Sequence, residues 1–263
     1  MKEENNKIED NNPYQNLNND PESHNQDVNE DVGLKSNLDE PLNDHTQWDI
    51  KMRLGFIRKV YGILVVQLAF TFLFCLISTT TDFITFQINN IAIFYLALIV
   101  SLVSAIVLIC SRSIARSVPT NYILLGLFTL CEAYMVGLIC GLSDPETVIM
   151  AAFMTLAVTI ALTIYAYKTE SDFTMMGGLL FVFGAIMLLF GIFMLFTDNP
   201  FLHIIYCCFG VLLYSMYLIY DTQLIIGEKK NKLSIDDYIV GAMMLYTDII
   251  GLFLNILELL SKK

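Results

Sequence analysis

Residues 238–260 read YIVGAMMLYTDIIGLFLNILELL, an apolar stretch of 23 residues with Asp248 near its middle and Glu258 near its end. About 20 apolar residues in helical form are enough to cross the hydrocarbon core of a bilayer. Asp248 would cost roughly 2.5–3.5 kcal/mol at the centre of such a helix, so we expect it to face protein. Its helical face also carries Gly241, Gly251 and Asn255, and small and polar residues are typical of close helix–helix contacts. The stretch therefore predicts a transmembrane helix that packs closely against another helix.

Six more segments of this character lie upstream. Each has a core of about 20 residues that is free of charged residues or contains a single acid, and the connections are short and contain turn residues. Pro119 and Pro200 suit the first turns of the third and sixth segments. We therefore predict an all-α membrane protein with seven transmembrane helices, near residues 57–78, 90–111, 121–142, 147–167, 174–196, 201–224 and 238–260.

The basic residues are distributed unevenly among the loops. Ten of them lie before or at the start of the first predicted helix, or in loops two–three, four–five and six–seven. The three intervening loops contain no Lys or Arg. The ten residues are Lys51, Arg53, Arg58, Lys59, Arg112, Arg116, Lys168, Lys229, Lys230 and Lys232. Because cytoplasmic loops carry an excess of Lys and Arg, we expect these loops and the N-terminus to face the cytosol. Lys262 and Lys263 lie on the far side if the seventh segment crosses fully, and in the cytosol if it is re-entrant. Its length favours full crossing.

The first 50 residues differ in composition from the rest. They hold 13 acidic residues against three lysines and supply −10 of the net charge of −11. Such a segment buries too little apolar surface to offset its ordering entropy. We therefore expect a disordered acidic cytosolic tail over 1–50 and a transmembrane domain over 51–263. The tail shows no cleavable signal peptide, and its negative charge argues against nucleic-acid binding.

The sequence contains no residue pattern typical of a catalytic site or of a bound cofactor. The six cysteines lie in apolar stretches without zinc-ligand spacing, and His203 is the one histidine outside the tail. We therefore expect no enzymatic activity, no resident cofactor and no disulfide framework.

Two acids near the C-terminus are the main functional candidates. Asp221 lies towards the end of the sixth predicted helix, on a face shared with Tyr214 and Tyr217, and a short hairpin joins this helix to the one that carries Asp248. If the two carboxyl groups meet in a low-dielectric site, they must share a proton or bind a cation such as Ca²⁺. The simpler alternatives are an interfacial position for Asp221 and one interhelical hydrogen bond for Asp248. We predict that the pair forms a pH sensor and cation site.

Three further residues are assigned to an ion pathway, and one to a latch. Glu132 lies within the third predicted helix, where it either lines an ion path or hydrogen-bonds to a neighbouring helix. Tyr217 and Asn255 share faces with the two aspartates and complete the predicted pathway. Arg112, at the cytosolic end of the second helix, either pairs with an aspartate as a protonation-controlled latch or extends towards the membrane surface.

Five sequence segments together resemble the Bax-inhibitor superfamily, in its Lifeguard branch: 56–62 (FIRKVYG), 167–173 (YKTESDF), 220–227 (YDTQLIIG), 237–242 (DYIVGA) and 245–250 (LYTDII). The resemblance covers the chain from about Arg53 to its end. It implies six helices around a central seventh, a di-aspartyl pH sensor at Asp221 and Asp248, and a latch arginine near Arg112. It also implies a pH-dependent Ca²⁺ leak across the membrane of the ER or Golgi, and restraint of cell death.

Two departures from the family pattern limit the resemblance. The second predicted helix has no acid within 91–110, so a third carboxylate is not expected in the site, and the tail lacks the Pro/Gly-rich character common in Lifeguard proteins.

The expected partners are the lipid bilayer, Ca²⁺, protons and apoptosis regulators. The alternative is a non-conducting regulator that binds apoptotic or ion-channel proteins, while short loops without paired cysteines disfavour a seven-helix ligand receptor.

Overall fold

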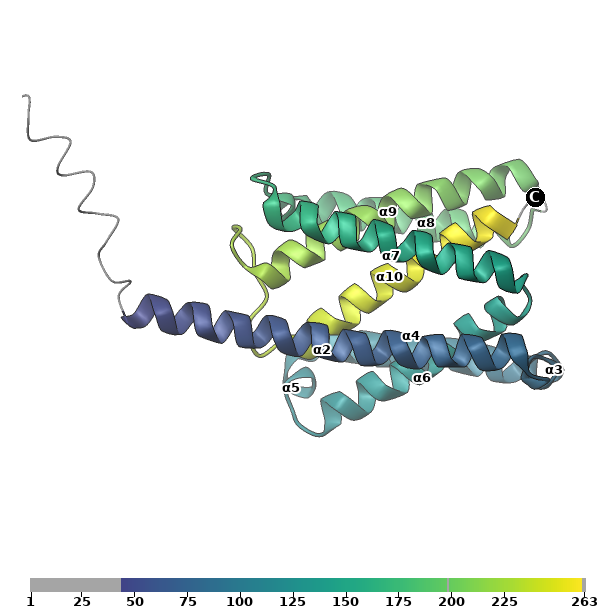
Figure 1. Ribbon diagram of the computed structural model, residues 1–263, viewed down its shortest axis with the longest axis horizontal. Helices are drawn as coiled ribbons and strands as arrows, with labels where there is room; N and C mark the ends of the chain where they lie inside the picture. Colours follow the sequence, from purple (N-terminus) through teal and green to yellow (C-terminus); the bar gives the residue numbers. More distant parts are fainter. Residues whose placement is uncertain (1–43, 198, 262–263) are drawn as a thin grey trace, which may run out of the picture. The chain divides into compact units, whose positions relative to one another are not determined.

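The computed structural model describes residues 44–197 and 199–261, and it contains helices and no strand within those ranges (Figure 1). The elements in chain order are α2 (Asp44–Thr80), α3 (Phe83–Asn89), α4 (Ile91–Cys110), α5 (Arg112–Ala115), α6 (Thr120–Gly141), α7 (Pro145–Lys168), the 3₁₀ helix η2 (Phe173–Met176), α8 (Gly177–Met194), α9 (Pro200–Ile226) and α10 (Tyr238–Ser261).

The prediction of seven transmembrane helices is confirmed. Seven helices of the described chain are long and apolar enough to cross a membrane, and they correspond one to one with the predicted segments. Local sequence explains where they begin. Pro200 occupies the first turn of α9, and the side chain of Asn199 caps that turn by accepting a hydrogen bond from the Phe201 amide at 3.0 Å.

The first helix begins earlier than predicted. Helix α2 starts at Asp44, so residues 44–50 are helical although the predicted tail included them; residues 1–43 of that tail lie outside the described residues. The short helices α3 and α5 were not predicted.

The C-terminal helix is the centre of the bundle, as predicted. In the most apolar part of α10, 67% of the residues are buried, against 50% in α6 and 11% in α7 and α8. Helix α10 contacts α9, α7, α6 and α4, and Figure 1 shows it passing obliquely through the middle of the bundle. A carboxyl group in this helix is therefore surrounded by protein on most sides.

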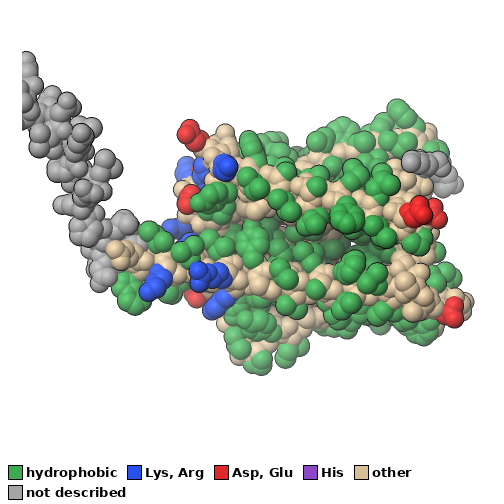
Figure 2. All heavy atoms as spheres, in the orientation of Figure 1, with side chains coloured by type: hydrophobic (Ala, Val, Ile, Leu, Met, Phe, Trp, Pro, Cys, Tyr) green, Lys and Arg blue, Asp and Glu red, His purple; other side chains and the backbone are tan. Residues whose placement is uncertain are grey.

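The exterior has the polarity of a membrane protein. Large apolar side chains such as Val66, Phe153 and Phe181 are exposed along the sides of the helices. Figure 2 shows this apolar surface, with the lysines and arginines on the face in view gathered at one end of the bundle. A lipid environment explains both features, because it accepts apolar side chains and excludes charged ones from its core.

Candidate functional site

Helices α9 and α10 approach each other closely where glycine meets a larger side chain. Gly210 of α9 lies directly against the Asn255 side chain, and Gly251 of α10 lies directly against the Tyr214 ring. A Cβ atom at either glycine would collide with its neighbour. The Asn255 amide also donates to the Gly251 carbonyl at 2.7 Å, which holds the side chain in place. These contacts fix the two helices that carry Asp221 and Asp248.

The structure brings Asp221 and Asp248 together. Their exposed fractions are 3% and 5%, and the two carboxyl groups lie within hydrogen-bonding reach of each other. Oδ1 of Asp221 and Oδ2 of Asp248 are buried without a hydrogen-bond partner from the described part of the protein. A hydrogen bond between two carboxyl groups requires a proton on one of them, and without that proton the pair would carry two uncompensated negative charges. The geometry can therefore hold a shared proton or attract a cation.

Arg53 anchors the end of the helix that carries Asp221. Its guanidinium donates to the carbonyl oxygens of Leu224 at 2.6 Å, Ile226 at 3.1 Å and Leu233 at 2.6 Å. Gly227, with φ of 78°, ends α9 in the left-handed conformation and packs directly against this guanidinium. Arg53 therefore ties α2 to the end of α9 and to the loop that follows.

Sequence reasoning missed this role, because it treated Arg53 only as one of the charges that set topology. Glycine commonly terminates helices, and the last carbonyl groups of a helix have no hydrogen-bond donor within it. Gly227 therefore signalled that the carbonyls at the end of α9 would need donors from elsewhere.

Gln223 anchors the same end of α9 from another direction. Its carboxamide oxygen accepts from the Phe173 amide at 2.8 Å, and its nitrogen donates to the Ser171 carbonyl at 3.0 Å. Both partners lie in the connection between α7 and α8. The polar run Asp221, Thr222 and Gln223 is fully buried, and such a run near the end of an apolar helix is the signal that could have identified this anchor.

Arg112 is not brought to the aspartate pair. It lies in α5 with an exposed side chain, whereas both aspartates are buried. Among the described residues, an ion pair joins Arg116, in the next loop, to Asp237 immediately before α10, through contacts of 2.7 and 3.0 Å. The short helix α5 turns Arg112 away from the bundle interior, which agrees with the alternative of an arginine that extends towards the membrane surface. A latch role for Arg112 stays a prediction.

The three predicted pathway residues are held by three different helix contacts. The Ser101 hydroxyl of α4 donates to a carboxylate oxygen of the half-buried Glu132. Tyr217 donates to the Leu180 carbonyl of α8 at 2.9 Å, and Asn255 packs against α9. For Glu132 this is the interhelical hydrogen bond considered as its alternative role. An ion pathway through these residues stays a prediction.

A calcium ion at the aspartate pair would need further oxygen ligands. The described residues contain no group of three or more His, Cys, Asp or Glu side chains that could hold a metal ion. Ca²⁺ prefers six to eight oxygen ligands, which include backbone carbonyls and water. Two carboxylates alone are therefore fewer ligands than a closed structural Ca²⁺ site requires.

The fold and the buried acidic pair define a polytopic helical membrane protein. The family described as "Inhibitor of apoptosis-promoting Bax1" matches residues 53–263. The chain is 37% identical to protein lifeguard 3 of Homo sapiens and 35% identical to that of Mus musculus, over 82% of this chain and 72% of each relative. It is 33% identical to protein LIFEGUARD 4 of Arabidopsis thaliana, over 80% of this chain and 85% of the relative. The chain therefore belongs to the Bax-inhibitor family, in its Lifeguard branch, a family of cell-death regulators.

Proposed function

We propose that this protein is a pH-sensitive Ca²⁺ leak channel of an intracellular membrane, the ER or Golgi, and that it regulates cell death through this leak. Asp221 and Asp248 are its proton sensor and cation site. The observation that carries the proposal is the contact between these two buried carboxyl groups, each with an oxygen that has no partner among the described residues.

The gating step follows from the charge of the pair. With one shared proton, the two carboxyl groups attract each other and stabilise the packing of α9 against α10. Loss of the proton leaves two adjacent negative charges, which must separate or be neutralised by a cation. Acidification of the cytosol therefore removes the cation site, and a rise in pH creates it.

The orientation of the channel rests on its charges. The gathering of Lys and Arg at one end of the bundle, on the face that Figure 2 shows, supports a cytosolic N-terminus. Helix α10, with 24 residues, is long enough to cross fully, which would place the C-terminus on the other side.

Ca²⁺ flux through the purified full chain in proteoliposomes tests the proposal. We expect flux to change when the pH is varied between about pH 6 and pH 8, because the charge of the carboxyl pair depends on its shared proton. Asp248→Asn, which cannot lose a proton, should flatten this profile. Asp144→Asn is the matched control, because Asp144 is exposed and lies outside the aspartate pair and the predicted pathway, and it should retain the profile. A wild-type profile in Asp248→Asn would refute the sensor assignment.

The second candidate is a non-conducting regulator that acts by binding apoptotic or ion-channel proteins. The family description as an inhibitor of apoptosis-promoting Bax1 favours it. Purified protein that passes no Ca²⁺ at any pH, yet binds such partners in a bilayer, would support this alternative over the channel.

A further inference from the structure

Two buried cysteines meet near one end of the α2–α6 helix pair. Cys75 lies close to the end of α2, and Cys140 is the next-to-last residue of α6. Both are free thiols, and the two side chains lie within hydrogen-bonding reach of each other. Both belong to the main hydrophobic core of the described chain. The structure therefore brings together two thiols from different helices.

The backbones of α2 and α6 come close around these thiols. A Cβ at Gly137 would lie 3.5 Å from the carbonyl oxygen of Phe74, the residue before Cys75. A Cβ at Gly141, the residue after Cys140, would lie 3.1 Å from a carbonyl oxygen of α2. A disulfide requires Cα atoms about 4.4–6.8 Å apart. Backbones this close on either side of both cysteines suit a bond between their sulfur atoms.

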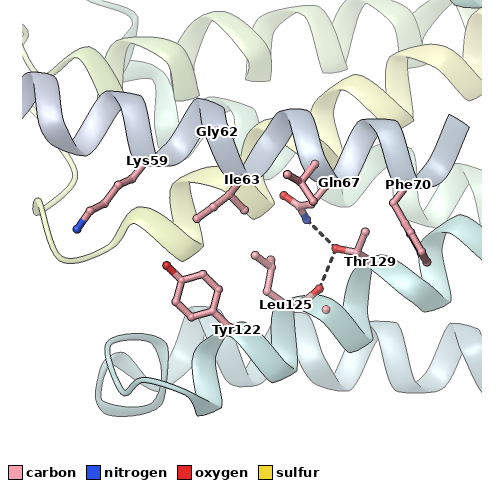
Figure 3. A pocket seen from close by; sticks show the side chains of 10 residues that line it. Lys59, Gly62, Ile63, Gln67, Phe70, Tyr122, Leu125 and Thr129 are labelled. Carbon is pink, nitrogen blue, oxygen red and sulfur yellow. Dashed lines mark hydrogen bonds between the residues drawn. The ribbon is translucent and has the colours of Figure 1, made fainter. Parts of the chain in front are cut away.

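Elsewhere along the same two helices the packing is more open. Gly62 of α2 and Gly126 of α6 have no atom within 4 Å of the position that a Cβ would occupy. A groove of about 640 Å³ lies between the helices there, and the Gln67 amide donates across to the Thr129 hydroxyl at 2.8 Å (Figure 3). The close approach is therefore confined to the end of the pair that carries the cysteines.

Polar contacts hold the helices together at that end. The Ser78 hydroxyl of α2 donates to the carboxamide oxygen of Gln87 in α3 at 3.0 Å, and the Gln87 nitrogen donates to the Tyr134 carbonyl of α6 at 3.0 Å. Ser78 and Gln87 are buried. Helix α3 therefore connects α2 to α6 close to the thiols and limits how far the two cysteines can separate.

The thiols differ in their access to the exterior. Cys75 is 7% exposed and lines a largely apolar groove of about 420 Å³, whose lining includes the exposed Leu76 and Ile149. Cys140 has an exposed fraction of 0%. A reagent can therefore reach the pair only at Cys75. So narrow an opening in an apolar wall admits a small neutral oxidant such as hydrogen peroxide, and it excludes a bulky charged one such as glutathione disulfide.

We propose that Cys75 and Cys140 are a modification site at which a peroxide forms a disulfide between α2 and α6, with Cys75 as the attacking thiol and Cys140 as the resolving thiol. The Cys75 sulfur, as thiolate, attacks one oxygen of hydrogen peroxide. The O–O bond breaks, and the hydroxide that leaves takes up the thiol proton to form water, so that Cys75 becomes a sulfenic acid.

The second step requires no further reagent. The Cys140 sulfur attacks the Cys75 sulfur, the S–O bond breaks, and the hydroxyl group leaves with the Cys140 proton as a second water. Together the two thiols lose two electrons, and the peroxide is reduced to two waters. The disulfide is independent of the aspartate pair, and it requires no Ca²⁺ flux.

Peroxide treatment of the purified full chain in nanodiscs tests the site. After free thiols are blocked in denaturant and the chain is digested, mass spectrometry should find a peptide that links Cys75 to Cys140, and dithiothreitol should remove it. Glutathione disulfide should not produce this peptide. Cys131→Ser, on the same helix as Cys140, is the matched control and should leave the link unchanged. If peroxide fails to link Cys75 to Cys140 in the folded wild type, the proposal is wrong.

Single variants test the order of the two steps. In Cys140→Ser the sulfenic acid of Cys75 has no resolving thiol, so dimedone, which reacts with sulfenic acids, should label Cys75. In Cys75→Ser, Cys140 should stay a free thiol after the same treatment. Dimedone labelling of Cys140, or its failure to label Cys75, would overturn the assigned order. Thermal unfolding of both variants checks that they fold, and the wild-type link tests the site even if they do not.

Discussion

The α4–α6 and α9–α10 helix pairs both carry carboxyl groups within the membrane-spanning region, but they satisfy them differently. Between α4 and α6, Glu132 accepts a hydrogen bond from Ser101. Between α9 and α10, Asp221 and Asp248 meet each other, and each has an oxygen without a partner among the described residues. A carboxyl group with a hydroxyl partner joins two helices, whereas two facing carboxyl groups form a site whose charge depends on a proton or a cation. The two helix pairs therefore differ in the partner that each buried acid has.

The two helix pairs also differ in how they are held. The α9–α10 pair has glycines in direct contact with side chains of the opposite helix, and Arg53 and Gln223 anchor the end of α9 from outside. On α6, Gly126 has no atom within 4 Å of the position that a Cβ would occupy. The aspartate pair is therefore part of a tightly constrained interface. This contrast can be tested by substitutions that relax or crowd the constraint.

The largest effect is expected from crowding the α9–α10 contact. Gly251→Leu would place a side chain in the space occupied by the Tyr214 ring. Overpacking of this kind costs about 1–3 kcal/mol, which lowers the apparent Tm by roughly 2–12 °C in a chain of this size. Thermal unfolding in detergent measures the change. Gly126→Leu on α6 is the control and should leave Tm nearly unchanged; equal losses in the two variants would remove the distinction between the helix pairs.

A smaller effect is expected from weakening the outer anchor of α9. In Arg53→Lys the charge is kept, but a single ammonium cannot reach the three carbonyls that the planar guanidinium bridges. Because Arg53 is partly exposed, we expect a loss of about 1–2 kcal/mol. Hydrogen–deuterium exchange should increase over residues 224–233. The same replacement at the exposed Arg58 serves as the control, and equal protection of 224–233 in both variants would contradict an anchoring role.

The smallest effect concerns Asp172, in the connection that Gln223 also holds. The Thr174 hydroxyl donates to its carboxylate at 2.6 Å and lowers the pKa of Asp172 below 3.8, with a further contribution from the Lys230 amide. Because the folded-state pKa is lowered, the stabilisation is present above pH 3.8 and is lost as the pH falls through the folded-state pKa.

The variant Asp172→Asn should therefore have a slightly lower Tm than the wild type at neutral pH, and the difference should disappear in strong acid. A Tm series against pH for both proteins measures this. A difference that persists unchanged at the lowest pH would show that the carboxylate charge does not contribute.

Much of the fold could be predicted because its determinants are local. The lengths of the apolar stretches and the positions of Pro119 and Pro200 place six of the seven helices within a few residues, since a bilayer of nearly constant thickness requires a nearly constant helix length. Helix α2 is the exception, because its first turns lie outside the apolar stretch. The short hairpin before α10 also made a meeting of Asp221 and Asp248 foreseeable.

The choice among arginines could not be predicted in this way. Arg53, Arg112 and Arg116 look alike as positive charges near one end of the bundle. In the structure Arg53 binds the carbonyls at the end of α9, Arg116 pairs with Asp237, and Arg112 is exposed. These roles depend on how two short loops fold and on the direction of each side chain, which charge counting does not contain.

The sequence by itself determined that this chain is a bundle of seven apolar helices with acids in its C-terminal pair, because hydrophobic length and charge placement act on each segment separately. Only the tertiary structure decided which acids share a site and which cation anchors α9. Those features arise from the rotation and close approach of different helices, and therefore from contacts between residues far apart in the chain.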